Sequence, residues 1–150
     1  RGFTLIELLL VVALIAIASG LASLALRDPA ASRLETEGAR LSALLEAARA
    51  EARAGGISVV WQPGTVVTAD SQRVDFRFVG LPNSSSLPTR WLEPSVVAQI
   101  VGATVLVLGP EPIIGAQRVE LRLDDQRLVL ATDGMGPFVA LADDVDAAQR

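Results

Sequence analysis

The 150-residue sequence contains no cysteine and no histidine, and all of its basic residues are arginine. Without cysteine, the chain cannot form disulfides or use thiolate chemistry, and cysteine usage indicates no compartment. Without histidine, it lacks the usual general base, the commonest metal ligand, and any Ser-His-Asp or Cys-His arrangement. We therefore expect no catalytic residue, no metal site and no cofactor, and we predict that the protein is not an enzyme.

The charge balance is acidic, with a formal net charge of -4 at pH 7. This balance argues against a nucleic-acid partner. The length suits one modest domain, and apolar residues make up 51% of the chain, which is enough for a core. The apolar residues are unevenly spread, however, because many of them fall in one run near the N-terminus.

That run, Leu8–Leu26, holds 19 residues without a charge. As a helix it would be about 28 Å long, close to the thickness of a bilayer core. Its few breaks are Ser19, Gly20 and Ser23, and small residues suit helix–helix contact in lipid. We predict a membrane span. The alternatives are a buried core helix and a cleaved signal peptide, whose apolar region would be only about 7–15 residues long.

A second helical pattern covers residues 27–56. Pro29 should break the helix or begin a new first turn with Asp28 as its cap, and Gly55-Gly56 is a stop signal. One apolar seam follows the heptad spacing, which indicates an amphipathic helix with one face for a core or a partner. The seam consists of Leu34, Gly38, Leu41, Leu45, Ala48 and Ala52, widened by Leu44.

The charged residues of this second helix are interpreted as a solvated face. Glu37 and Arg40 are three residues apart, as are Glu46 and Arg49, so each pair can form a weak ion pair on the helix surface.

Short β-rich runs follow the second helix and are separated by turn residues. A turn is expected at Pro63-Gly64, a hairpin at Asp124-Asp125-Gln126, and loops at Gly80–Thr89 and Gly109–Gly115. The expected strands are Ile57–Gln62, Thr65–Ala69, Arg73–Val79, Thr104–Leu108, Arg118–Leu123, Arg127–Thr132 and Phe138–Ala142. The fold class is therefore α+β, with a long N-terminal helix packed on a small, mostly antiparallel β head.

Two further expectations concern the core of this head. Residues 73–79 alternate apolar and charged side chains, so Phe76 and Asp75 should lie on opposite faces of the strand. Trp61 and Trp91 are predicted to anchor the core rather than an interface.

The polar clusters of the chain do not assemble an active site. Asp143, Asp144 and Asp146 lack the glycine and the distal glutamate of an EF-hand loop, so a solvated tail is favoured. The stretch Asp133–Pro137, DGMGP, lacks the lysine and the following helix of a phosphate loop. The serines at Ser84–Ser86 have no base to activate them and are interpreted as a flexible loop.

Glu7 differs from these residues because it lies at the start of the apolar stretch. Ionisable groups inside membrane segments are rare and usually functional. The alternative is that the Glu7 side chain extends to the membrane interface, since it lies near the end of the predicted span.

The stretch GFTLIELL, at Gly2–Leu9, resembles the N-terminal processing motif of type IV pilins and type II secretion pseudopilins. Gly2, Phe3 and Glu7 match its glycine, its phenylalanine and the glutamate at the fifth position of the mature chain. The resemblance implies that prepilin peptidase cleaves between Gly2 and Phe3 and methylates the new amine of Phe3. Glu7 could then pair with the Phe3 amine of its own chain, about one helical turn away, or with that of another subunit. The second pairing assigns Glu7 to assembly.

Further stretches look like the H-type minor pseudopilins, often grouped as GspH/FimT. They are ARLSALLEAARAEARAGG, VDFRF, RWLEP and DGMGPF. Pro29 departs from this pattern, because it lies farther along the chain than the early helix proline of many pilins.

The resemblance implies a pilin-like organisation of the whole chain. Residues 1–2 would be the remnant of the leader, and residues 3–28 the transmembrane and assembly half-helix in the bacterial inner membrane. Residues 29–56 would be the amphipathic half-helix, forming one domain with a periplasmic β-rich head over residues 57–150. The implied partners are the I-, J- and K-type minor pseudopilins, the major pseudopilin, prepilin peptidase and inner-membrane lipid. The seam and the two predicted loops of the head are the expected contacts with other subunits.

Three functions follow from these observations. The first is a non-enzymatic minor pseudopilin that helps to initiate or cap the pseudopilus for protein export. The second is a minor type IV pilin of the FimT kind, acting in pilus assembly or DNA uptake. It would need a basic, exposed C-terminal region, whereas the tail is acidic. The third, a signal-anchored envelope enzyme or binding domain, is disfavoured by the missing histidine and cysteine and by the specific N-terminal motif.

Overall fold

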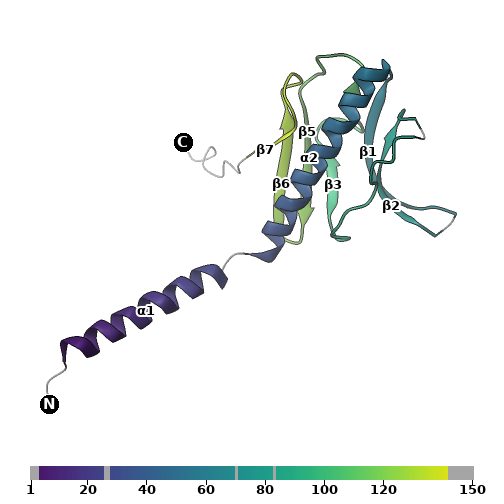
Figure 1. Cartoon of the computed structure of the whole chain (residues 1–150). Coiled ribbons are helices and arrows are strands. Elements are labelled where there is room, and N and C mark those ends of the chain that lie inside the picture. The colour runs from purple at the N-terminus through teal and green to yellow at the C-terminus, as the bar shows by residue number, and fades with distance from the viewer. Residues whose placement is uncertain (1–3, 26–27, 70, 83, 142–150) are drawn as a thin grey trace.

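The computed structural model describes residues 4–25, 28–69, 71–82 and 84–141. Within these residues the chain forms two helices followed by seven strands, an α+β arrangement of the pilin-like kind, as predicted (Figure 1). The elements are α1 (Leu5–Ala25), α2 (Pro29–Gly55), β1 (Val59–Val67), β2 (Arg73–Val79), β3 (Val97–Ile100), β4 (Leu106–Gly109), β5 (Gln117–Leu123), β6 (Gln126–Thr132) and β7 (Val139–Leu141).

Helix α1 extends away from the head, whereas α2 lies along it (Figure 1). Every side chain described in α1, over residues 5–20, is exposed. No helix in the described part of the chain is both long enough and apolar enough to cross a membrane. The single pass predicted over residues 3–28 is therefore unconfirmed.

Helix α2 begins and ends where the sequence signals predict. Asp28 is the N-cap, its carboxylate accepts a hydrogen bond from the Ala30 amide at 2.9 Å, and Pro29 occupies the first turn. Gly56 closes the helix in a left-handed conformation with φ of 59°, which glycine adopts without a steric penalty. The six residues of the seam are all buried.

Two antiparallel sheets form the head. In the first sheet the strand order is β2-β1-β4, and in the second it is β3-β5-β6-β7. Helix α2 covers one face of the second sheet (Figure 1) and contacts both sheets. The core lies between α2 and the two sheets, and it includes Trp61 and Trp91, as predicted. Phe76 joins them, with its ring centroid 5.8 Å from that of Trp61 and 4.6 Å from that of Trp91.

The turn predicted at Pro63-Gly64 is wrong, because β1 continues through these residues to Val67. Pro63 lies beyond Trp61, the last residue of β1 that pairs with β4, so its missing N–H removes no bond to that strand. The pairing with β2 shifts register between Pro63 and Val66, and this irregularity accommodates the Pro-Gly pair.

The second sheet contains one strand that was not predicted from the sequence, β3, and one hairpin that was predicted, between β5 and β6. Strand β3 pairs with β5, but its four residues are too short a run to stand out in the sequence. Strands β5 and β6 pair through the predicted hairpin, in which Asp124 adopts a positive φ of 52°. Aspartate tolerates this conformation better than most residues.

The prediction that the charges of α2 form a solvated face is wrong at Glu37 and Arg49, each of which is only 1% exposed. Glu37 accepts a hydrogen bond from the Glu93 amide at 2.7 Å and pairs with Arg40 at 3.5 Å. Arg40 in turn donates to the Arg90 carbonyl at 2.9 Å. Glu37 is buried because the loop at residues 90–93 covers it.

Asp75 of β2 fastens the same loop from the other side. It is buried and accepts hydrogen bonds from the Trp91 amide at 3.0 Å and from Arg73 Nε at 2.5 Å. The stretch RWLEP is therefore held by two buried carboxylates, one from α2 and one from β2. Each carboxylate has hydrogen-bond partners, which buried charges require.

Arg49 fastens the loop between β6 and β7. Its guanidinium donates to the Gly136 carbonyl at 2.8 Å and to the Gly134 carbonyl at 3.3 Å, and it pairs with Glu46 at 3.1 Å. Glu46 also accepts a hydrogen bond from the Phe138 amide at 3.3 Å. The stretch DGMGPF is thus hydrogen-bonded to the Glu46–Arg49 ion pair of α2, which was predicted to lie on the solvated face of the helix.

Candidate processing and assembly site

The predicted site residues lie at the N-terminal end of the chain. Gly2 and Phe3, the predicted processing and methylation positions, fall outside the described residues. Glu7 is described, and it lies in the first turn of α1 with an exposed side chain. The structure therefore places one of the three predicted residues.

Thr4 caps α1, and this residue was missed in the sequence. The Glu7 amide donates hydrogen bonds to the Thr4 carbonyl at 3.1 Å and to Thr4 Oγ1 at 3.4 Å, and the Leu8 amide donates to the same carbonyl at 3.2 Å. Thr4 and Glu7 have the T-x-x-E spacing of a capping box, which is the signal that could have revealed the cap. The carboxylate of Glu7 also lies near the positive end of the helix dipole, which favours a negative charge.

The surface of α1 is apolar on all sides. Leu5 is 78% exposed and Ile6 is 76% exposed, and large aliphatic side chains remain exposed along the helix. They include Leu8, Leu9, Leu10, Val11, Val12, Leu14, Ile15 and Ile17. A soluble amphipathic helix would bury one face on its own domain, but α1 buries no side chain over residues 5–20, where burial is described. An exposed apolar surface of this size marks a contact with lipid or protein.

Glu7 is the one charged residue on this surface over the described residues 4–20. It forms no ion pair with any residue that the structure describes. Its side chain is exposed on the apolar surface of the helix.

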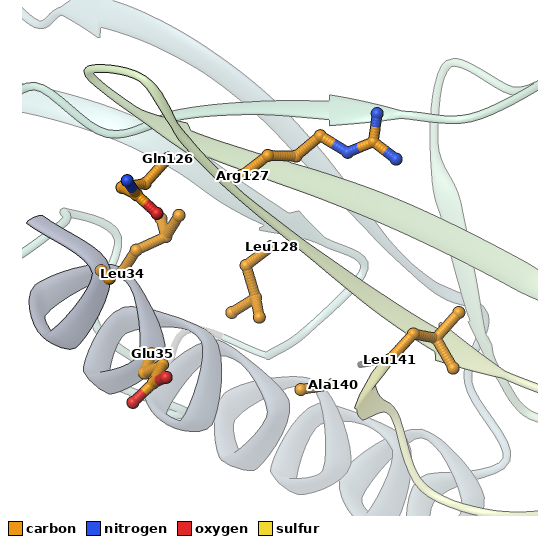
Figure 2. Close-up of a pocket in the computed structure, with 8 residues that line it drawn as sticks. Leu34, Glu35, Gln126, Arg127, Leu128, Ala140 and Leu141 are labelled. Carbon is orange, nitrogen blue, oxygen red and sulfur yellow. The ribbon is translucent and has the colours of Figure 1, made fainter. Parts of the chain in front are cut away.

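One hollow of the head is lined by both apolar and charged side chains. This cavity of about 470 Å³ lies between α2 and strands β6 and β7. Figure 2 shows Leu34 and Leu128 lining it, with the Glu35 carboxylate and the Arg127 guanidinium on opposite sides. No described residues form a group of three or more His, Cys, Asp or Glu side chains suited to a metal ion.

The seam of α2 was expected to contact other subunits, and this expectation is wrong. Leu41, Leu45, Ala48 and Ala52 are fully buried within the head, so they are not available to a partner. The reason is that both sheets pack against this face of the helix. Side chains at the predicted loops, Gly80–Thr89 and Gly109–Gly115, are mostly exposed or half-buried over their described residues.

Comparison with known proteins yields one match. The prokaryotic N-terminal methylation motif matches residues 1–23. No curated protein and no solved structure matches the chain. The matched motif is of the type IV prepilin kind, and together with the long helices and antiparallel sheets it supports a pilin-like protein. The motif indicates a substrate of prepilin peptidase that assembles into a pilus-like filament, and it suggests membrane-anchored assembly.

Proposed function

We propose that the protein is an H-type minor pseudopilin of a type II secretion system. It helps to initiate or cap the pseudopilus that exports folded proteins, and it has no enzymatic activity. The I-, J- and K-type minor pseudopilins and the major pseudopilin are its partners. Its anchor lies in the bacterial inner membrane, and its head lies in the periplasm.

One observation carries this proposal. Helix α1 is apolar on every side, has one carboxylate in its first turn, and precedes a head that buries its own core. Lipid covers such a helix while the subunit is alone, and neighbouring helices cover it in a filament. The matched N-terminal motif supports the coarser part of this assignment, a pilin-like substrate of prepilin peptidase.

Glu7 directs the insertion of a subunit into the filament. Cleavage after Gly2 creates a positive amine on Phe3, and a docked subunit offers this amine to the Glu7 carboxylate of an incoming one. Two charges that are costly in an apolar environment then neutralise each other, so the assembled state is favoured over the free subunit. The pair also determines the axial position of the subunit.

Processing gives a first test of the proposal. Gly2→Val is expected to block cleavage, because a branched side chain at the scissile bond obstructs the peptidase, and Gly2→Ala should be cleaved poorly. The measurement is the gel mobility of the full chain when it is co-expressed with prepilin peptidase. Normal cleavage of the Gly2→Val chain would contradict the assigned processing site.

Secretion gives the test of the specific system. In a strain that lacks the protein, folded exported proteins should accumulate in the periplasm, and the wild-type chain should restore their release. Normal secretion in that strain, together with a loss of pili or of DNA uptake, would overturn the secretion role.

The second candidate is a minor type IV pilin that acts in pilus assembly or DNA uptake. One observation favours it, namely that Arg118, Arg122 and Arg127 lie exposed on one face of the second sheet. The net charge of -4 disfavours it. A gel shift with duplex DNA at physiological salt distinguishes the candidates, because the secretion role predicts no retarded band.

A further inference from the structure

The two faces of the second sheet differ in what covers them. Val119 and Leu121 of β5 point into the core and are fully buried. The residues between them along the strand point the other way, onto the opposite face, where Arg118 and Arg122 are exposed. This outer face includes Val97 and Gln99 of β3, Arg118, Glu120 and Arg122 of β5, Arg127, Val129 and Ala131 of β6, and Val139 and Leu141 of β7.

The strand register brings these residues together. Arg122 is paired with Arg127 across β5 and β6, and Arg118 is paired with Ala131. Ala131 is in turn paired with Val139 of β7. Directly paired residues of an antiparallel sheet project from the same face. The outer face therefore has an arginine-rich centre on β5 and an apolar margin on β7.

The outer face is basic although the protein is acidic. Glu120 forms ion pairs with both Arg122 and Arg127, at 3.7 Å in the case of Arg127. Arg118 has no ion-pair partner among the described residues. These four side chains have a net charge of +2, so the remainder of the sequence has a net charge of -6. The charge of the chain is thus strongly asymmetric.

The apolar margin of the outer face contains a hollow. Val139 is 51% exposed and Leu141 is 42% exposed, although both are large aliphatic residues. A hollow of about 520 Å³ lies between Arg118, Val139 and the loop at residues 133–137. The hydrogen bonds from Arg49 and Thr132 to the Gly136 carbonyl hold that loop in place.

We propose that the outer face is the docking surface for a neighbouring filament subunit that presents carboxylates around an apolar side chain. Arginine beside aliphatic residues is typical of protein interfaces, because guanidinium pairs with carboxylate and also packs on apolar groups. The hollow receives the apolar side chain, and Arg118, which has no ion pair within the described part of the chain, receives a carboxylate of the partner. The inference rests on the proposed function, because it takes the partner to be a subunit of the same filament.

The absence of cysteine from the chain makes a direct test possible. A single cysteine at Val139, labelled with a benzophenone maleimide, reports contacts of the outer face in the full chain in its host membranes. A cysteine at Val67, which is 67% exposed on the first sheet, is the matched control. The Val139 label should cross-link to a subunit that carries the N-terminal methylation motif, and the Val67 label should not.

Charge reversal tests the role of Arg118. Arg118→Glu should reduce both the Val139 cross-link and filament incorporation about tenfold. The reason is that like charges facing each other across an interface weaken the affinity by about tenfold or more. Arg77→Glu, an exposed arginine of the first sheet, should change neither. Unchanged circular dichroism and unfolding of both variants show that the head is intact.

Four results would overturn the proposal. They are normal incorporation of the Arg118→Glu chain, equal cross-linking from Val67 and Val139, and retention of duplex DNA by wild type but not by Arg118→Glu. The fourth is loss of the charge-reversal effect in a chain that ends at Leu141, because the acidic residues that follow would then be the partner of Arg118.

If Glu7→Ala blocks incorporation while Arg118→Glu does not, the docking surface fails and the proposed function stands. If neither variant affects incorporation, the proposed function itself fails.

Discussion

The two helices of the chain are similar in length but opposite in what surrounds them. Helix α1 has 21 residues and buries none of its described side chains, whereas α2 has 27 residues and buries eight of them. The two helices also differ in charge. Glu7 is the one charged residue among the described side chains of α1, whereas α2 carries two ion pairs whose members also bond to two loops of the head. The head thus surrounds the buried face of α2, whereas the side chains described in α1 remain exposed.

This difference indicates that α2 serves the stability of the head, whereas α1 serves assembly. Residues of α2 hold the head together, so their substitution should change the free energy of unfolding. The side chains of α1 are exposed over residues 5–20, so their substitution should change what the chain binds and leave the stability of the head unchanged. Trp61 and Trp91, the two tryptophans of the chain, are both buried in the head, and their fluorescence reports unfolding of the head alone.

The largest effect on stability is expected for Leu41→Ala in α2. Leu41 is 0% exposed, and its truncation leaves a cavity between the helix and the sheets. The free energy of unfolding should fall by about 2–5 kcal/mol. The measurement is urea unfolding of the full chain in detergent, followed by tryptophan fluorescence.

Leu9→Ala in α1 is the matched control, because it makes the same chemical change on the other helix. It should leave the unfolding of the head unchanged, since Leu9 is 61% exposed. Equal losses from the two substitutions would show that α1 packs on the head and would break the distinction between the helices.

A smaller loss is expected for Arg49→Met. The carbonyls of Gly134 and Gly136 lose their guanidinium donor but keep a second one, from the Ile114 amide and the Thr132 hydroxyl respectively. The loss is therefore that of hydrogen bonds to a charged group, which contribute about 1.5–3 kcal/mol each at most. Arg53→Met, one turn later on an exposed part of the same helix, should cost less than about 0.5 kcal/mol. If both variants unfold alike, the bonds between α2 and the loop at residues 133–137 do not stabilise the head.

The smallest effect concerns the acid dependence of stability. Hydrogen bonds from the amides of Gly136 and Met135 lower the pKa of the Asp133 carboxyl below its ordinary value. A folded-state pKa below the unfolded one gives stability that is present above the unfolded pKa of about 3.9 and is lost as the pH falls through the folded pKa. Asp133→Asn should therefore flatten the decline in stability below about pH 4. Unfolding curves at pH 7 and pH 3 test this, and an equal decline in both chains would contradict it.

Much of the fold could be predicted from local signals. The boundaries of α2 follow from Asp28, Pro29 and Gly56, whose effects act within one helical turn. The hairpin of β5 and β6 follows from alternation around Asp124-Asp125. The prediction of a turn at Pro63-Gly64 was wrong because the pairing of β1 with β2 outweighs the local turn preference of this dipeptide.

The burial of Glu37, Arg49 and Asp75 could not be predicted from local signals alone, because loops distant in the sequence cover these charged side chains. Glu37 and Arg49 do follow seam residues at helical spacing, Leu34 by three and Leu45 by four, and this position was a usable signal. Asp75 offered no comparable signal, since its burial depends on the loop that contains Trp91. At the candidate site, the role of Glu7 stays a prediction, and the cap provided by Thr4 was missed.

The central claim is that α1 serves assembly and that Glu7 directs it. A single cysteine introduced at Leu14 allows α1 to be cross-linked to neighbouring helices in membranes, because the chain has no other thiol. In this background we compare Glu7→Ala and Glu7→Asp with the wild-type glutamate, and we measure membrane abundance, cross-linking and secretion. The expected result is normal abundance and a folded head for all three, with cross-linking and secretion impaired in Glu7→Ala and intermediate in Glu7→Asp. A Glu7→Ala chain that cross-links and secretes like wild type would contradict the account and would leave Glu7 as a charge near the end of an apolar helix.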